Sequence, residues 1–171
     1  MGATTETTAE TFEAKPLRSQ TRRVLPEWID YNGHMNVAYY VLAIDKAMDD
    51  IFDQLGMGLD LVRERRMGPM ALVNQIHYLD ELLEGQEFVC DLQVLDADHK
   101  RMHYFVTMHH LAKGTVAATF EGLSINVDLE ARRSVAYPED VHAKLEAVRQ
   151  AHAALPRPPQ TGARIGIRRA G

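Results

Sequence analysis

A change in the period of the apolar residues is the feature that most constrains the fold of this chain. Between Val37 and Leu55 the apolar side chains recur at alternating spacings of four and three, which is typical of one face of a helix. Gly56 follows as a helix stop signal. From Pro69 to Ala136 the period changes to two, which is typical of β-strands. The sequence therefore predicts one long helix followed by a run of strands.

The strand region divides at clusters of turn-forming residues. These breaks fall at Glu84-Gly85, at residues 96–100 and at Lys113-Gly114, and they are typical of hairpin connections between antiparallel strands. A short extended segment, residues 21–29, precedes the long helix. A last amphipathic helix is expected to begin at Pro138, where proline and acidic residues favour a helix N-terminus.

One sheet can bury one long helix only if it curls around that helix, because a flat sheet would leave the far side of the helix in water. We therefore expect an α+β fold in which an antiparallel sheet of about five strands wraps around a central helix. The second face of such a sheet also carries apolar residues. A second subunit would cover them, so we expect a homodimer or a dimer-based tetramer.

The chain has 171 residues, which is enough for one domain with appendages. Residues 1–18 are rich in Thr, Glu and Ala and predict a flexible leader. Residues 19–155 are expected to form the domain, and residues 156–171 a basic C-terminal tail.

Charge and composition exclude several classes of function. The formal net charge of -5 gives the chain no general attraction to nucleic acid or to an anionic membrane. No apolar stretch approaches the ~20 residues of a membrane span, and acidic residues stand where a signal peptide would be basic. We therefore expect a cytoplasmic protein.

Metal and disulfide chemistry are not expected either. Cys90 is the one cysteine, so no internal disulfide can form. His109 and His110 are adjacent on a predicted strand and must point to opposite faces, which is unsuitable for joint chelation. We expect no cofactor and no metal.

Polar side chains are concentrated where the first extended segment meets the long helix. Residues 30–36 read DYNGHMN and contain Asp30, Asn32, His34 and Asn36 around one glycine. Capping a helix needs one such side chain, so the surplus indicates a second role. Unpaired N–H groups at the helix start, together with a carboxylate, suit acyl transfer, in which one group activates water and the other stabilises the oxyanion.

This stretch strongly resembles the D-x-N-x-H-x-N motif of hotdog-fold thioesterases. Residues 118–121 and 126–133, ATFE and NVDLEARR, are similar to the last-strand pattern A-T-x-E…H-V-D-x-x-x-R-[RK] of bacterial members, although Asn126 replaces the histidine. The resemblance implies a hotdog fold and hydrolysis of an acyl-CoA. It also implies that Asp30 is the general base or nucleophile, that Asn32 and His34 orient water and polarise the carbonyl, and that amides of Met35, Asn36 and Val37 form the oxyanion hole.

Within that group, residues 28–40 resemble the subgroup of carnitine catabolism that is proposed to hydrolyse betainyl-CoA. Four aromatic residues are candidates for a trimethylammonium pocket: Trp28, Tyr31, Tyr39 and Tyr78. Arg132 and Arg133 are candidates for binding the CoA phosphates. Glu121 is a candidate supporting residue, in its own subunit or in a partner's site.

Two alternatives remain open at this point. Hotdog enoyl-CoA hydratases resemble D-x-N-P-x-H, but His34 follows Asp30 at a shorter spacing here and the proline is missing. A non-catalytic acyl-CoA-binding module on the same scaffold is the second alternative.

Overall fold

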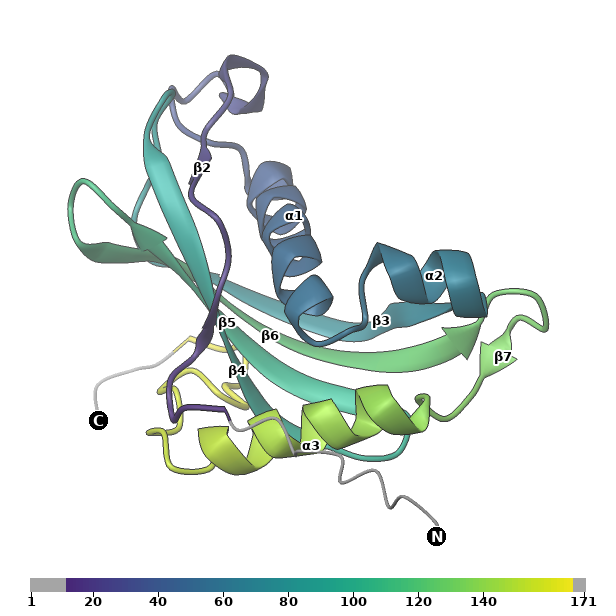
Figure 1. The fold of residues 1–171 in the computed structure, drawn as a ribbon. Coiled ribbons are helices and arrows are strands. Elements are labelled where there is room, and N and C mark those ends of the chain that lie inside the picture. The colour runs from purple at the N-terminus through teal and green to yellow at the C-terminus, as the bar shows by residue number, and fades with distance from the viewer. Residues whose placement is uncertain (1–11, 168–171) are drawn as a thin grey trace, which may run out of the picture.

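The computed structural model describes residues 12–167. Most of the predicted leader, residues 1–11, lies outside this range. The described chain forms an antiparallel sheet that curls around one long helix (Figure 1). Its strands run in the order β1-β4-β5-β6-β3, and β2 and β7 are attached to β4 and β6. The strands are β1 (Leu17–Arg18), β2 (Arg22–Arg23), β3 (Met67–Tyr78), β4 (Glu87–Ala97), β5 (Arg101–His110), β6 (Thr115–Asp128) and β7 (Arg133–Ser134).

The sheet has seven strands rather than about five. The four long strands agree with the predicted alternations, and the breaks at residues 96–100 and at Lys113-Gly114 are the predicted hairpins β4–β5 and β5–β6. The break at Glu84-Gly85 is not a hairpin, because β3 pairs with β6 and lies at the other side of the sheet from β4. The additional strands β1, β2 and β7 are two residues long. A segment of that length is too short to show a period of two, so the sequence pattern could not reveal it.

The helices of the described chain are a short 3-10 turn, η1 (Pro26–Trp28), and three α-helices: α1 (Val37–Gln54), α2 (Leu59–Arg65) and α3 (Glu139–His152). The predicted central helix is α1, and the predicted last helix is α3. Helix α2 was not predicted. None of these helices is long and apolar enough to cross a membrane.

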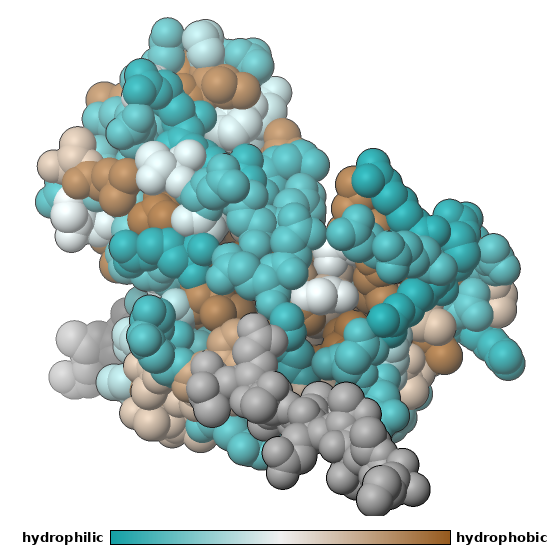
Figure 2. Space-filling model, viewed as in Figure 1, coloured by the Kyte–Doolittle hydropathy of each residue, from teal (hydrophilic) through white to brown (hydrophobic). Residues whose placement is uncertain are grey.

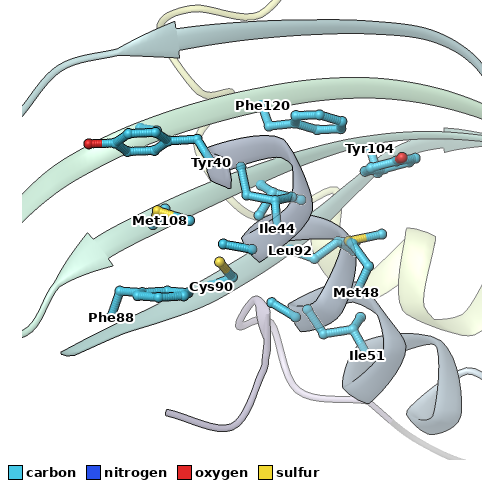
Figure 3. Close-up of a cluster of buried hydrophobic side chains, with 14 of the residues drawn as sticks. Tyr40, Ile44, Met48, Ile51, Phe88, Cys90, Leu92, Tyr104, Met108 and Phe120 are labelled. Carbon is cyan, nitrogen blue, oxygen red and sulfur yellow. The ribbon is translucent and has the colours of Figure 1, made fainter. Parts of the chain in front are cut away.

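The core lies between α1 and the concave face of the sheet (Figure 3). Ile44, Met48 and Ile51 of α1 are buried against side chains of β4, β5 and β6. The sheet contributes Phe88, Cys90, Leu92, Tyr104, Met108 and Phe120 to this cluster. The sheet therefore fixes the position of α1, and with it the position of the polar loop that precedes α1.

The first two residues of the apolar stripe on α1 are only partly covered by the chain itself. Val37 is 56% exposed and Val41 is 39% exposed. Strand β3 is the last strand of the sheet, and residues 70–74 in it are exposed, including Leu72 and Val73. An unpaired, apolar edge strand next to an apolar helix face is unusual for an isolated protein.

The opposite edge of the sheet is closed by the two ends of the domain. Buried His152, the last residue of α3, accepts a hydrogen bond at Nδ1 from Val94 N (2.9 Å). Its Nε2 lies 2.9 Å from the carbonyl oxygen of Lys15 and donates to it. Leu17, within the predicted leader, pairs with Leu92 of β4. Part of the predicted leader is therefore built into the sheet.

The convex side of the molecule carries the predicted tail. Gly162 N donates to Glu121 Oε2 (2.6 Å) on β6, and Gln75 Nε2 on β3 donates to Ala163 O (2.8 Å). On the concave side, Figure 2 shows a hollow between the parts of the molecule that carry α1 and α2. A cavity of about 430 Å³ lies there, lined by residues that include Phe52 and Val62.

Candidate active site

Residues 30–36 form a closed loop at the head of α1. Ile29 and Met35 form an isolated antiparallel bridge, and Asp30 N donates to His34 O (3.1 Å). Gly33 turns the chain between them with φ +83°, a conformation that side chains disfavour. The loop is anchored to the rest of the molecule because Met35 N donates to Leu82 O (2.8 Å). These backbone contacts hold the loop in place and with it the polar side chains at the head of α1.

The Asp30 carboxylate is half-buried and held by two donors. Asn32 N donates to its Oδ1 (2.8 Å), and Asn36 Nδ2 donates to its Oδ2 (3.3 Å). Both donors are uncharged amides, so they fix the orientation of the carboxylate without neutralising its charge. A fixed carboxylate with free lone pairs can accept a proton from a water molecule.

Asn36 is the N-cap of α1 as well as a partner of Asp30. Its Oδ1 accepts from Ala38 N (3.0 Å). Two of the three amides predicted for the oxyanion hole are already used, because Met35 N donates to Leu82 O and Asn36 N donates to Trp28 O. Among the described residues, Val37 N has no hydrogen-bond acceptor. Of the three amides predicted for the oxyanion hole, the amide of Val37 is therefore the one that is free to bind an oxyanion.

A cavity of about 260 Å³ lies beside this loop. It is lined by His34, Met35, Val37, Tyr40, Tyr78, Leu79, Asp80 and Glu81. His34 Nδ1 lies 3.3 Å from Met35 O, so a proton on Nδ1 leaves Nε2 free as an acceptor. Asn32 is exposed. The structure thus brings Asp30, Asn32, His34 and Val37 together in one short loop and helix start.

Tyr40 builds one wall of this cavity. Its hydroxyl donates to Asp80 O (3.3 Å) and accepts from Leu82 N (3.1 Å), and burial raises the pKa of this phenol. It therefore ties α1 to the segment after β3. Tyr40 was not singled out from the sequence, where it follows Tyr39 and looks like ordinary core.

The four predicted headgroup aromatics do not form one box in the chain. Trp28 stacks on Tyr39 with ring centroids 5.8 Å apart, whereas Tyr78 packs edge-on against Tyr40 at 5.2 Å. Tyr31 is 96% exposed. Of the four, Tyr78 alone lines the cavity beside His34.

The remaining candidates lie elsewhere on the sheet. Glu121 is on the convex face, where its Oε1 lies 2.7 Å from His103 Nε2. Arg132 and Arg133 are exposed beyond the end of β6 that pairs with Met67. That end is about 33 Å along β6 from Ala118, the partner of Tyr78, at ~3.3 Å per residue. Within one chain these arginines are therefore remote from Asp30.

Asn126, which replaces the histidine of the family pattern, is buried at the same end of β6. Its Nδ2 donates to Val135 O (3.4 Å) and Ala136 O (3.2 Å). It therefore holds the segment that leads to α3. Residues 12–167 contain no group of three or more His, Cys, Asp or Glu residues arranged to hold a metal ion.

Comparison with known families identifies the family of this chain. The family model of the thioesterase-like superfamily matches residues 24–145, which include all of α1 and the four long strands. This chain belongs to the thioesterase-like superfamily. The match confirms the family that the motif at residues 30–36 predicted.

Curated relatives give a more specific likeness. A betainyl-CoA thioesterase of Pseudomonas aeruginosa is 34% identical over 146 residues, which cover 84% of this chain and 91% of that protein. An L-carnitine dehydrogenase/betainyl-CoA thioesterase of a Rhizobium species is 34% identical over 162 residues, or 95% of this chain. The chain spans about a third (32%) of the length of that relative.

Solved structures share the fold. A hypothetical protein of Staphylococcus aureus, determined in complex with CoA, superposes with a TM-score of 0.82 at 27% identity, covering 93% of this chain and 99% of that one. A DHNA-CoA thioesterase of Staphylococcus aureus gives a TM-score of 0.73, covering 80% and 93% of the two chains. At 15% identity the second likeness shows the fold alone.

Proposed function

We propose that this chain hydrolyses an acyl-CoA thioester to free CoA and a carboxylic acid. The observation that carries the proposal is the pairing of two groups in one loop: a half-buried Asp30 carboxylate oriented by two N–H donors, and the unpaired Val37 N–H at the head of α1. Together they supply the base and the oxyanion donor that acyl transfer needs. Membership of the thioesterase-like superfamily supports the same reaction.

The proposed reaction uses water as the second substrate. Asp30 accepts a proton from the water molecule while the water oxygen attacks the carbonyl carbon. The Val37 N–H and the positive end of α1 together stabilise the oxyanion that forms. The tetrahedral oxyanion then collapses, the C–S bond breaks, and the CoA thiolate takes the proton that Asp30 accepted from the water molecule. His34 and Asn32 orient the water and the carbonyl from the loop that they share with Asp30.

Betainyl-CoA is the substrate that we favour. The relatives that match most of this chain carry betainyl-CoA thioesterase in their names. A trimethylammonium group is attracted to aromatic rings, and Tyr78 lines the cavity beside His34. The product of this reaction would be betaine, as in the degradation of carnitine. We place the activity in the cytoplasm, where the free thiol of Cys90 stays reduced.

The proposed enzyme is a homodimer in which two β3 strands pair edge to edge, with a dimer-based tetramer as a further assembly. The exposed residues 70–74 of β3 and the exposed Val37 and Val41 of α1 support this, since one contact would cover all of them. Antiparallel pairing would also bring the Met67 end of one β3 toward the Tyr78 end of the other. Arg132 and Arg133 of one subunit would then serve the CoA bound at Asp30 of the other.

A thiol-release screen tests the function. Purified protein is assayed with betainyl-CoA beside short-chain, long-chain and aryl-CoA esters, and Asp30→Asn is assayed in parallel. We expect betainyl-CoA to be hydrolysed best, and Asp30→Asn to lose about 10²–10⁴-fold in kcat with an unchanged circular dichroism spectrum. Near-wild-type turnover by Asp30→Asn across the panel would remove Asp30 from the chemistry.

The same samples separate the two alternatives. An enoyl-CoA hydratase would consume the conjugated chromophore of crotonyl-CoA without releasing thiol. A binding module would retain CoA esters with no turnover of any of them.

A further inference from the structure

The C-terminal tail crosses the convex face of the sheet toward the free edge. It leaves α3 beside β4, reaches Glu121 on β6 through Gly162 N, and then reaches Gln75 on β3 through Ala163 O. Because the strand order is β4-β5-β6-β3, this path runs across the sheet and ends over its last strand. Ala163 therefore lies over the last strand of the sheet, next to its free edge.

The residues that follow are apolar and uncovered. Ile165 is 95% exposed and Ile167 is 87% exposed, which makes them, with Tyr31, the most exposed large apolar side chains among residues 12–167. Two isoleucines at this spacing in an extended segment point to the same side. Arg164 precedes them and is also exposed.

A matching surface is present on the convex face, close to the same edge. The cavity there measures about 450 Å³ and is lined by Val73, Gln75, Asp96, Ala97, Asp98, Arg101, His103, Glu121, Gly122, Leu123, Gly162 and Ala163. Val73 is 63% exposed on β3 itself. The cavity combines apolar residues with polar side chains that are paired with one another, Asp98 with Arg101 and Glu121 with His103. Its apolar part is therefore the surface that matches the two isoleucines.

We propose that the segment Arg164–Ile167 of one subunit crosses the β3 edge and docks in this cavity of a second copy, reciprocally in both directions. The proposal rests on the homodimer of the proposed function. Four extended residues span about 13 Å at ~3.3 Å per residue, and two strand spacings measure about 10 Å. The segment is therefore long enough to pass over the partner's β3 and reach its β6. Ile165 and Ile167 contact the apolar lining near the partner's β3 and β6.

Replacing the two isoleucines of the segment Arg164–Ile167 tests the proposal by its effect on dimer formation. The double substitution Ile165→Ser with Ile167→Ser is compared with the conservative pair Ile165→Val and Ile167→Val, by sedimentation velocity over a range of concentrations. We expect the serine pair to raise the dimer dissociation constant about tenfold or more, and the valine pair to change it little. Both side chains are exposed within the chain, so neither variant should alter the circular dichroism spectrum. An unchanged dissociation constant in the serine pair would refute the docking of this segment, although the protein would still be a dimer.

A disulfide distinguishes exchange between subunits from a fold-back within one. Ile165→Cys combined with Leu123→Cys is oxidised at low concentration and analysed on a non-reducing gel, beside each single substitution. A covalent dimer in the double variant alone supports the crossing. A disulfide within the monomer, or free thiols in a protein that is still dimeric, would contradict the crossing. A small molecule found bound in the cavity by native mass spectrometry would contradict it as well. A wild type that is monomeric at all concentrations would instead refute the homodimer.

Discussion

The side chain of Asn36 joins the candidate base to the helix that carries the candidate oxyanion donor. Its Nδ2 donates to Asp30 Oδ2 across 3.3 Å, and its Oδ1 accepts from Ala38 N across 3.0 Å. The amide that separates these two contacts is Val37 N, which has no acceptor among the described residues. Asn36 therefore sets the position of the carboxylate relative to the amide.

Substitutions at Asn36 should separate its two roles. Asn36→Asp keeps an acceptor for Ala38 N but replaces the donor to Asp30 with a second carboxylate. We expect it to retain the stability of the wild type and to lose activity. Asn36→Ala loses the cap as well, and its free energy of unfolding should fall by about 1 kcal/mol. Urea unfolding and kcat measurements on both variants check this, and an Asn36→Asp enzyme of normal activity would show that the donor is dispensable.

Replacing Arg132 and Arg133 should weaken the binding of CoA. Arg132 has φ +55°, so Arg132→Asn is preferred because asparagine tolerates this conformation, and Arg133→Ser completes the pair. We expect KM for the acyl-CoA to rise about tenfold with little change in kcat. The matching acyl-pantetheine thioester lacks the nucleotide phosphates, and its KM should be the same in both proteins. An equal rise with both substrates would indicate a general disturbance of the site.

His152 should make the fold sensitive to acid. Burial lowers the pKa of His152 below its ordinary value, so the folded protein binds this proton less readily than the unfolded chain. The stabilising contribution of neutral His152 is present above the unfolded pKa of about 6.5 and is lost as the pH falls toward the lower folded pKa. Charging the ring would place a proton on Nδ1, opposite the N–H of Val94.

The measurement compares unfolding free energies of wild type and His152→Gln between pH 5 and 8. We expect the variant to be less stable at pH 8 and the difference to shrink as the pH falls. A difference that is constant over this range would show that His152 does not titrate with unfolding.

Gly122 should be hard to replace because Tyr104 lies directly over it. A Cβ at position 122 would overlap the ring of Tyr104, and Tyr104 is a buried residue of the core. We expect Gly122→Ala to cost about 1–3 kcal/mol of stability through overpacking. Combining it with Tyr104→Val should recover part of that loss in a double-mutant cycle. Simple additivity of the two substitutions would mean that the ring moves aside freely.

The sequence predicted the elements whose periodic pattern is long. Helix α1 and strands β3 to β6 were found because each carries enough turns or alternations to show its period. Helix α2 was missed because residues 59–65 are few and contain a run of charged residues. The pattern also could not show that Val37 and Val41 stay uncovered, since an apolar stripe looks the same whether its own chain or a second copy buries it.

The sequence predicted which residues make up the candidate site but not which hydrogen bonds they form. The motif at residues 30–36 identified the polar side chains, and the loop holds them together. Which amides are free depends on Leu82 and Trp28, whose carbonyl groups engage Met35 N and Asn36 N and whose positions only the fold determines. The partner of Glu121 was equally invisible, because His103 approaches it from a neighbouring strand.

The hydrogen bond from His152 to Lys15 joins residues 137 positions apart and has a consequence for synthesis of the chain. Lys15 is synthesised before the sheet, but the imidazole that accepts a hydrogen bond from Val94 N and donates one to Lys15 O is made only after every strand of the sheet. Until then the β4 edge lacks its closing helix. The nascent domain therefore completes its fold only after α3 has been synthesised, and premature termination before α3 should yield products that are degraded rather than partially active.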